Sequence, residues 1–134
     1  MKTALLSVFI MLFTAPLFSQ DIDYDKKKSV VLVDTKECLK YDGKEVPGVT
    51  YSSLAGEELF FIGFARDKYG NTYWHVVFLK SKKEMNYRVN FASKKAFLAK
   101  AVKDGLLKDC TLNEEKLDNF ILKYDERIAL IDSE

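Results

Sequence analysis

The stretch LFFIGFARDKYGNTYWHVVFLK, residues 59–80, carries the strongest structural signal in the chain. Two runs rich in β-branched and aromatic residues, 59–66 and 72–80, flank a five-residue loop in which Gly70 can take a left-handed backbone conformation. Both runs place apolar side chains on both sets of alternating positions. Such strands belong in the middle of a sheet that is covered on two sides, or on one side and by a partner on the other. The stretch therefore predicts a central β-hairpin.

Further strand signals lie on both sides of this hairpin. Residues 29–34, 38–41 and 49–54 form shorter apolar runs before it, and Asp42-Gly43 predicts a tight turn after the second of these runs because both residues tolerate positive φ. After the hairpin, residues 85–91 alternate apolar with polar side chains, which indicates a half-buried strand with one wet face. Together these segments predict an antiparallel β-meander of about five to six strands.

The pattern in the last third of the chain predicts two helices. Ser93 is a good N-cap for a helix over residues 94–104, and Gly105 is placed to end it. A second helix begins either with a capping box from Thr111 or with Asn113 as the cap, and Ile128 and Ile131 would extend its apolar stripe. The two stripes, predicted to pack on one face of the sheet, are Phe97, Leu98, Ala101 and Val102, and Leu117, Phe120, Ile121 and Tyr124. The expected fold class is α+β.

The N-terminus has the pattern of a cleaved export signal. Lys2 precedes an apolar run over residues 4–18, which is shorter than the roughly 20 residues that a membrane-spanning helix needs. Cleavage is expected between Ser19 and Gln20, or alternatively after Ala15. Neither position is followed directly by a cysteine, so a lipid anchor at the N-terminus is excluded and no stable membrane anchor is expected. We expect an exported protein of the periplasm or extracellular space, with residues 20–28 as a flexible tail and 29–134 as one α+β domain.

Export bears on the two cysteines, Cys38 and Cys110. Disulfides persist in exported proteins, and these two residues have no third competitor. A bridge would close a loop of about 70 residues and contribute on the order of 4 kcal/mol in the chain-entropy model. The alternative is a pair of reduced thiols packed as small hydrophobic groups. The sequence leaves both possibilities open.

Several function classes find no support in the residue pattern. The only histidine, His75, lies inside a predicted strand, where a side chain hydrogen-bonded to a neighbour is more plausible than a general base. Two distant cysteines and one histidine do not make a zinc site, and the glycine spacing matches no nucleotide-binding loop. We expect no metal and no cofactor. Cleavage would remove Lys2 and leave 20 basic against 20 acidic residues, without the basic surplus of a nucleic-acid binder.

The expected function is that of a small non-catalytic binding or interaction domain for an unknown protein or small molecule. The candidate binding residues are Arg66, Tyr69, Tyr73 and Trp74, because aromatic and arginine side chains dominate interaction hot spots. They would form an exposed apolar patch, unless Trp74 is an ordinary core residue. Two alternatives remain: a structural subunit whose sheet is completed by another chain, for example in a homodimer, and a small hydrolase that uses two carboxylates.

Overall fold

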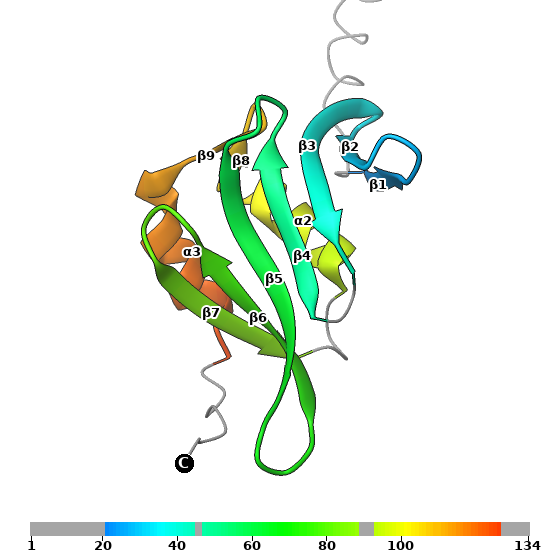
Figure 1. Cartoon of the computed structure of the whole chain (residues 1–134). Helices are drawn as coiled ribbons and strands as arrows, with labels where there is room; N and C mark the ends of the chain where they lie inside the picture. Colours follow the sequence, from blue (N-terminus) through cyan, green and yellow to red (C-terminus); the bar gives the residue numbers. More distant parts are fainter. Residues whose placement is uncertain (1–20, 45–46, 89–92, 127–134) are drawn as a thin grey trace, which may run out of the picture.

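The computed structural model of the chain describes residues 21–44, 47–88 and 93–126. Within these residues, seven strands form one antiparallel sheet in which each strand pairs with the next along the chain (Figure 1). The strands are β1 (Ile22–Asp25), β2 (Val30–Val33), β3 (Lys36–Gly43), β4 (Gly48–Ser53), β5 (Glu58–Arg66), β6 (Thr72–Phe78) and β7 (Lys83–Arg88). They are followed by helix α2 (Lys94–Lys103), the short hairpin β8 (Leu107–Lys108) and β9 (Thr111–Leu112), the 3-10 turn η1 (Glu114–Lys116) and helix α3 (Leu117–Tyr124).

The predicted α+β class, a meander followed by two helices, is confirmed, but the sheet has one strand more than expected. Residues 20–28 were expected to form a flexible tail, and this expectation is wrong for the described part of the segment. β1 pairs with β2 from Ile22↔Val33 to Asp25↔Val30, and Ile22 is only 3% exposed. Ile22 and Tyr24 alternate with aspartates, so this short strand has one apolar and one charged face.

Two turns differ from the sequence expectation. Asp42 and Gly43 are not the turn between β3 and β4, because Gly43 still pairs with Val49 and the chain reverses after it. The tight turn between β2 and β3 instead uses Asp34 and Thr35, with φ of 51° and 72°. A threonine with positive φ is unusual, since its branched side chain disfavours the left-handed region. This turn consequently has no clear signature in the sequence.

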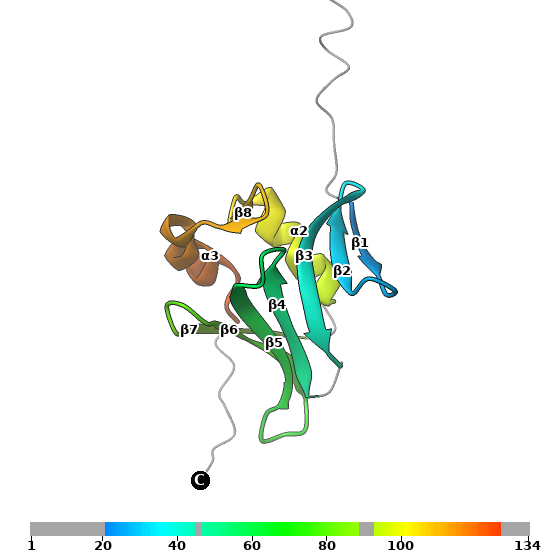
Figure 2. The ribbon, with the colours of Figure 1, turned by 45° about the horizontal axis from the view of Figure 1, so that its top comes forward.

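Both helices lie on the same side of the sheet (Figure 2), as predicted. The side chains of Phe60, Ile62, Trp74, Val76 and Met85 point to this side and join one apolar core with Phe97, Leu98 and Phe120; we call it the helix-covered face. Phe97 lies at its centre, because its ring contacts Phe60, Tyr87 and Phe120 with centroid separations of 6.0, 5.2 and 5.6 Å. The predicted helical stripes are therefore the residues that close the core.

The helix ends follow the predicted capping chemistry. The Ser93 side chain accepts a hydrogen bond from the Ala96 amide at 3.0 Å, and Gly105 has φ of 82° just after α2 ends. Of the two caps considered for the second helix, Asn113 is the one used: its side chain accepts from the Glu115 amide and starts η1, which leads into α3. α3 ends at Tyr124, and Ile128 and Ile131 lie outside the described residues.

The two cysteines form a disulfide. Cys38 in β3 and Cys110 in the turn between β8 and β9 are bonded, with Cα atoms 5.1 Å apart. The bond fastens the β8–β9 hairpin to the sheet across a sequence separation of 72 residues. Cys38 is 2% exposed and belongs to the core on the helix-covered face.

The segment after α3 pairs with the outer edge of β7. The Asn86 amide donates to the Asp125 carboxylate at 2.9 Å, and the Asn86 carbonyl accepts from the Glu126 amide at 2.9 Å. The Arg88 amide donates to the Glu126 carboxylate at 3.1 Å. An exposed strand edge invites pairing with other chains, so these contacts protect β7.

The predicted export signal lies outside the described residues. In the part of the chain that the structure describes, neither α2 nor α3 has the length and apolar character needed to cross a bilayer.

Candidate functional site

A cavity of ≈ 400 Å³ opens between the sheet and the first turn of α2. This volume is within the range of small-molecule sites. Its floor is buried and includes Val49, Tyr51 and Trp74, whereas its rim includes the exposed residues Lys26 and Lys95. We call it the tyrosine pocket, and its lining residues are Tyr24, Lys26, Tyr41, Gly43, Val49, Tyr51, Trp74, Ser93, Lys94 and Lys95.

Strand alternation brings the three tyrosines of the pocket together. Tyr41 in β3 is directly paired with Tyr51 in β4, and Tyr24 in β1 lies two strands away from Tyr41 on the same face. The rings of Tyr24 and Tyr41 meet edge to face with centroids 5.0 Å apart. Because paired residues of an antiparallel sheet share a face, tyrosines distant in sequence form one aromatic surface.

The polar groups of this surface are neutral hydroxyls. The hydroxyl oxygens of Tyr24 and Tyr51 are 2.7 Å apart and share a hydrogen bond. Burial raises the pKa of Tyr24 to about 12 and also raises the pKa of Tyr51 well above its ordinary value. Both side chains are therefore protonated at neutral pH, and they offer hydrogen bonds rather than charge.

Nearby, the hydroxyl of Tyr87 is buried without a hydrogen-bond partner among the described residues. Burial raises the pKa of Tyr87, and the interaction with Tyr24 raises it further. Tyr87 does not line the tyrosine pocket, but it is paired across β6 and β7 with Trp74, which does.

The rim of the pocket carries three lysines. The ammonium of Lys94 lies 4.1 Å from the centroid of the Trp74 ring, in cation–π contact, and that of Lys95 lies 3.4 Å from a carboxylate oxygen of Asp23. Lys26 belongs to the β1–β2 turn. The described lining contains three lysines and no Asp or Glu, so the charged side chains that line the mouth of the pocket are all basic.

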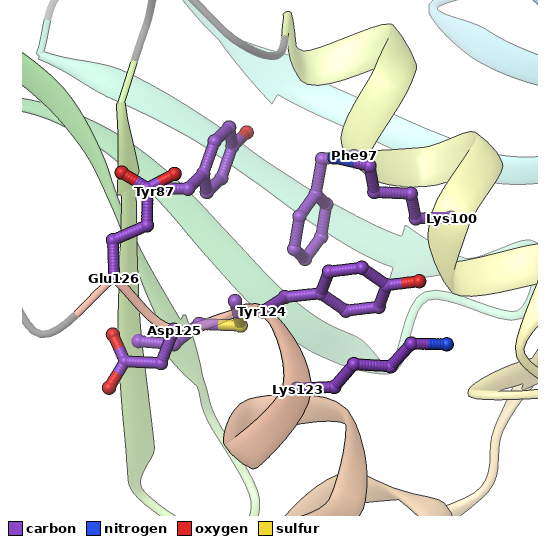
Figure 3. A pocket seen from close by; sticks show the side chains of 8 residues that line it. Tyr87, Phe97, Lys100, Lys123, Tyr124, Asp125 and Glu126 are labelled. Carbon is purple, nitrogen blue, oxygen red and sulfur yellow. The ribbon is translucent and has the colours of Figure 1, made fainter.

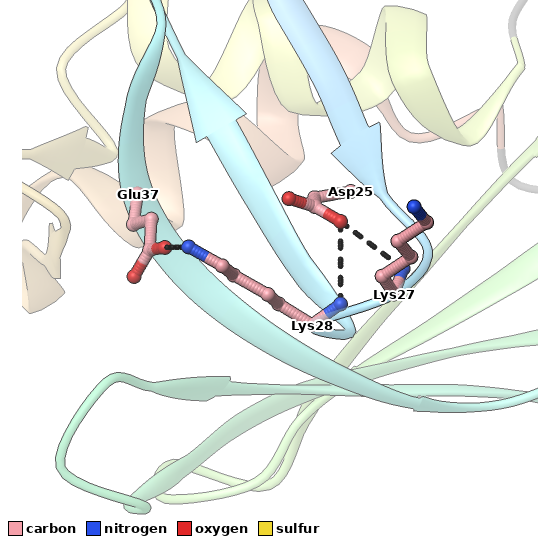
Figure 4. Close-up of polar contacts among 4 residues, drawn as sticks. All are labelled: Asp25, Lys27, Lys28 and Glu37. Atoms are coloured by element: carbon pink, nitrogen blue, oxygen red, sulfur yellow. Dashed lines mark hydrogen bonds and ion pairs between the residues drawn. The ribbon is translucent and has the colours of Figure 1, made fainter.

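The β1–β2 turn that carries Lys26 is held by its own hydrogen bonds (Figure 4). The Asp25 carboxylate accepts from the amides of Lys27 and Lys28 at 3.0 and 3.2 Å. The ammonium of Lys28 in turn pairs with Glu37 on β3 at 3.2 Å. Asp25 thereby fixes the backbone on both sides of Lys26.

A second cavity, of ≈ 240 Å³, lies between β7, α2 and α3 (Figure 3). It has two carboxylates in its lining, Asp125 and Glu126, and both accept the β7 hydrogen bonds described above. Lys123 pairs with Asp104 at 3.2 Å, and the ammonium groups of Lys100 and Lys123 lie 5.4 and 5.1 Å from the Tyr124 ring. Since these charged groups hold the structural elements together, we interpret this cavity as a packing gap.

The four residues expected to form an exposed patch are separated in the structure. Trp74 lines the tyrosine pocket and is 3% exposed, whereas Tyr73 is 2% exposed and faces the other side of the sheet. Tyr69 is 77% exposed at the tip of the β5–β6 loop, and Arg66 is exposed at the end of β5. The expectation of one continuous patch is wrong, because adjacent strand residues point to opposite faces and α2 covers Trp74.

His75 lies on the face opposite the helices. Its Nδ1 is 2.6 Å from the Asn86 side-chain oxygen, and its Nε2 is 2.9 Å from the Glu84 carboxylate. The prediction of a histidine hydrogen-bonded to a neighbour on the sheet is therefore confirmed. Among the described residues, no cluster of three or more His, Cys, Asp or Glu side chains could hold a metal ion.

Most pocket residues were not among the sequence candidates. Tyr24 could have been found from the alternation of Ile22 and Tyr24 with aspartates, which marks a strand. Lys94 and Lys95 stand in the first turn of a predicted helix, where positive charge opposes the helix dipole. Tyr41 and Tyr51 carry no such signal, because only the register of β3 and β4 makes them neighbours.

Comparison of the chain with family models, with curated proteins and with solved structures finds no match.

Proposed function

We propose that the protein is a small exported binding domain without catalytic activity, and that its ligand occupies the tyrosine pocket. The observation that carries the proposal is the cavity itself: four aromatic side chains surround a space of ≈ 400 Å³ that opens to solvent beside α2. Aromatic rings bury apolar ligand surface at low entropic cost, and their hydroxyls orient it.

The groups in the pocket suit binding better than catalysis. The tyrosine hydroxyls keep their protons at neutral pH because burial raises the pKa of Tyr24 and Tyr51. A protonated phenol is a poor nucleophile, but it is a good hydrogen-bond donor and acceptor. The lysines on the rim add an attractive field for ligands of opposite charge.

Export is proposed from residues 1–19, whose pattern is that of a secretion signal. The Cys38–Cys110 disulfide is compatible with this proposal, since such bonds persist in oxidising compartments.

Trp74 makes the proposal directly testable, because it is the only tryptophan of the chain and lines the pocket. The neutral aromatic probe N-phenyl-1-naphthylamine, which accepts energy from tryptophan, should quench Trp74 emission in a saturable way. Tyr41→Ala should weaken this binding by about tenfold, as expected for the loss of one aromatic contact.

The matched control is Tyr69→Ala, which removes a tyrosine side chain of the same kind from a loop, where Tyr69 is 77% exposed. This variant should bind the probe like the wild type. Equal affinity of both variants, or no saturable quenching up to the solubility limit of the probe, would contradict binding in the tyrosine pocket.

A further inference from the structure

The first turn of α2 contains an unusual concentration of positive charge. Its residues include Lys94 and Lys95 and no acidic side chain, although the N-terminus of a helix already carries a partial positive charge. Acidic residues are normally favoured at this position. The arrangement places two positive charges at the pocket mouth, where a bound anion would be stabilised.

Two carboxylates, those of Asp23 and Asp25, lie beside these lysines. Asp23 is shared with Lys95 at 3.4 Å, while Asp25 accepts two backbone hydrogen bonds in the β1–β2 turn. Both Lys26 and Lys95 are exposed, so their ammonium groups can move toward a ligand at small cost. The cavity thus combines a basic rim with a floor of aromatic rings.

On the basis of the proposed binding function, we infer that the ligand of the tyrosine pocket is a small amphiphilic anion. Its apolar or aromatic body would lie on the floor formed by Tyr41, Val49 and Trp74. Its acidic group, a carboxylate, sulfonate or phosphate, would lie at the rim between Lys26 and Lys95. The Tyr24–Tyr51 hydroxyl pair supplies hydrogen bonds between these two ends.

Two probes of nearly the same shape test this inference. 8-Anilinonaphthalene-1-sulfonate carries a sulfonate that N-phenyl-1-naphthylamine lacks, and both accept energy from Trp74. At low ionic strength the sulfonate-bearing probe should bind about tenfold more tightly than the neutral probe. This difference in affinity should shrink as added salt screens the lysines.

The variant Lys26→Gln/Lys95→Gln should abolish this difference while changing the affinity of the neutral probe by no more than about twofold. The matched control, Lys108→Gln/Lys116→Gln, removes two exposed lysines that do not line the pocket, and it should keep the difference. Thermal unfolding of both variants verifies that they are folded.

The outcomes separate this inference from the proposed function. If the wild type binds the two probes with equal affinity, the anion preference is overturned and the binding function is left intact. The same conclusion follows if Lys26→Gln/Lys95→Gln still prefers the sulfonate probe. A preference lost equally in the control also overturns it, because a general charge effect would then be responsible. Failure of both probes to bind contradicts the proposed function itself.

Discussion

The two faces of the sheet come from the same strands but differ in what surrounds their side chains. On the helix-covered face, Phe60 is 1% exposed and packs against Phe97. On the opposite face, the adjacent residue Phe61 is half-buried, and His75 is hydrogen-bonded to Asn86. Both faces of the central hairpin read as apolar in the sequence. Neighbouring apolar side chains therefore differ in burial according to what lies over each of them. The helices cover Phe60, whereas on the opposite face Phe61 stays partly exposed and Tyr73 is 2% exposed without any contribution from the helices.

On the opposite face, an aromatic ring rather than a helix covers part of the backbone. Gly63 and Gly48 are paired across β5 and β4, and the Phe61 ring lies over them. A Cβ atom at Gly63 would stand 2.7 Å from this ring, and one at Gly48 would stand 2.6 Å from the Ile62 carbonyl oxygen. Glycine at position 63 therefore leaves the space that the neighbouring aromatic ring occupies.

The largest contrast is expected from truncating one phenylalanine on each side. Phe120→Ala removes a ring that is 3% exposed and should cost about 3–5 kcal/mol, a large part of the stability of a small domain. Phe61→Ala should cost about 1 kcal/mol, because its ring is already partly in contact with water. Urea unfolding measures both values, and equal losses would contradict the assignment of a single core.

A second contrast concerns the disulfide, which belongs to the helix-covered face. Replacing Cys38 and Cys110 together with alanine should lower stability by about 4 kcal/mol, because the unfolded chain loses the constraint of a 72-residue loop. Hydrogen exchange should accelerate first in β8 and β9, which the bond fastens to β3. An unchanged melting temperature after reduction of the wild type would exclude a stabilising role.

The smallest effect concerns pH, and it arises from the tyrosines of the helix-covered face. The pKa of Tyr24 is raised from 10.0 to about 12, so above pH 10 the unfolded chain loses this proton while the folded chain keeps it. The stabilising contribution is therefore complete below pH 10 and is lost as the pH rises to 12, by about 1.4 kcal/mol per pH unit.

Tyr24→Phe should make this alkaline slope less steep, although it also removes the hydrogen bond to Tyr51. Tyr69→Phe changes an exposed loop residue and is the matched control, whose curve of stability against pH should superimpose on that of the wild type. Guanidinium unfolding at a series of pH values gives the slopes. An unchanged slope in Tyr24→Phe would mean that its hydroxyl is accessible to water in the folded state.

The sequence by itself determined the elements whose signals are local. The two apolar runs at 59–66 and 72–80, with the glycine-containing loop between them, predicted the central hairpin, and Ser93 and Gly105 marked the ends of α2. The helical stripes predicted which residues close the core, since a spacing of three and four places side chains on one face of a helix. The bonding of Cys38 to Cys110 was one of two open alternatives, because pairing depends on the distance between segments.

Only the tertiary structure decided what surrounds each of these elements. It placed β1 in the sheet, moved the β3–β4 turn beyond Gly43 and put Tyr73 and Trp74 in different environments. The tyrosine pocket in particular required the register of β1, β3 and β4 together with the position of α2. The physical reason is that local patterns specify which face of an element is apolar, whereas a cavity exists only where several such faces meet without filling the space between them.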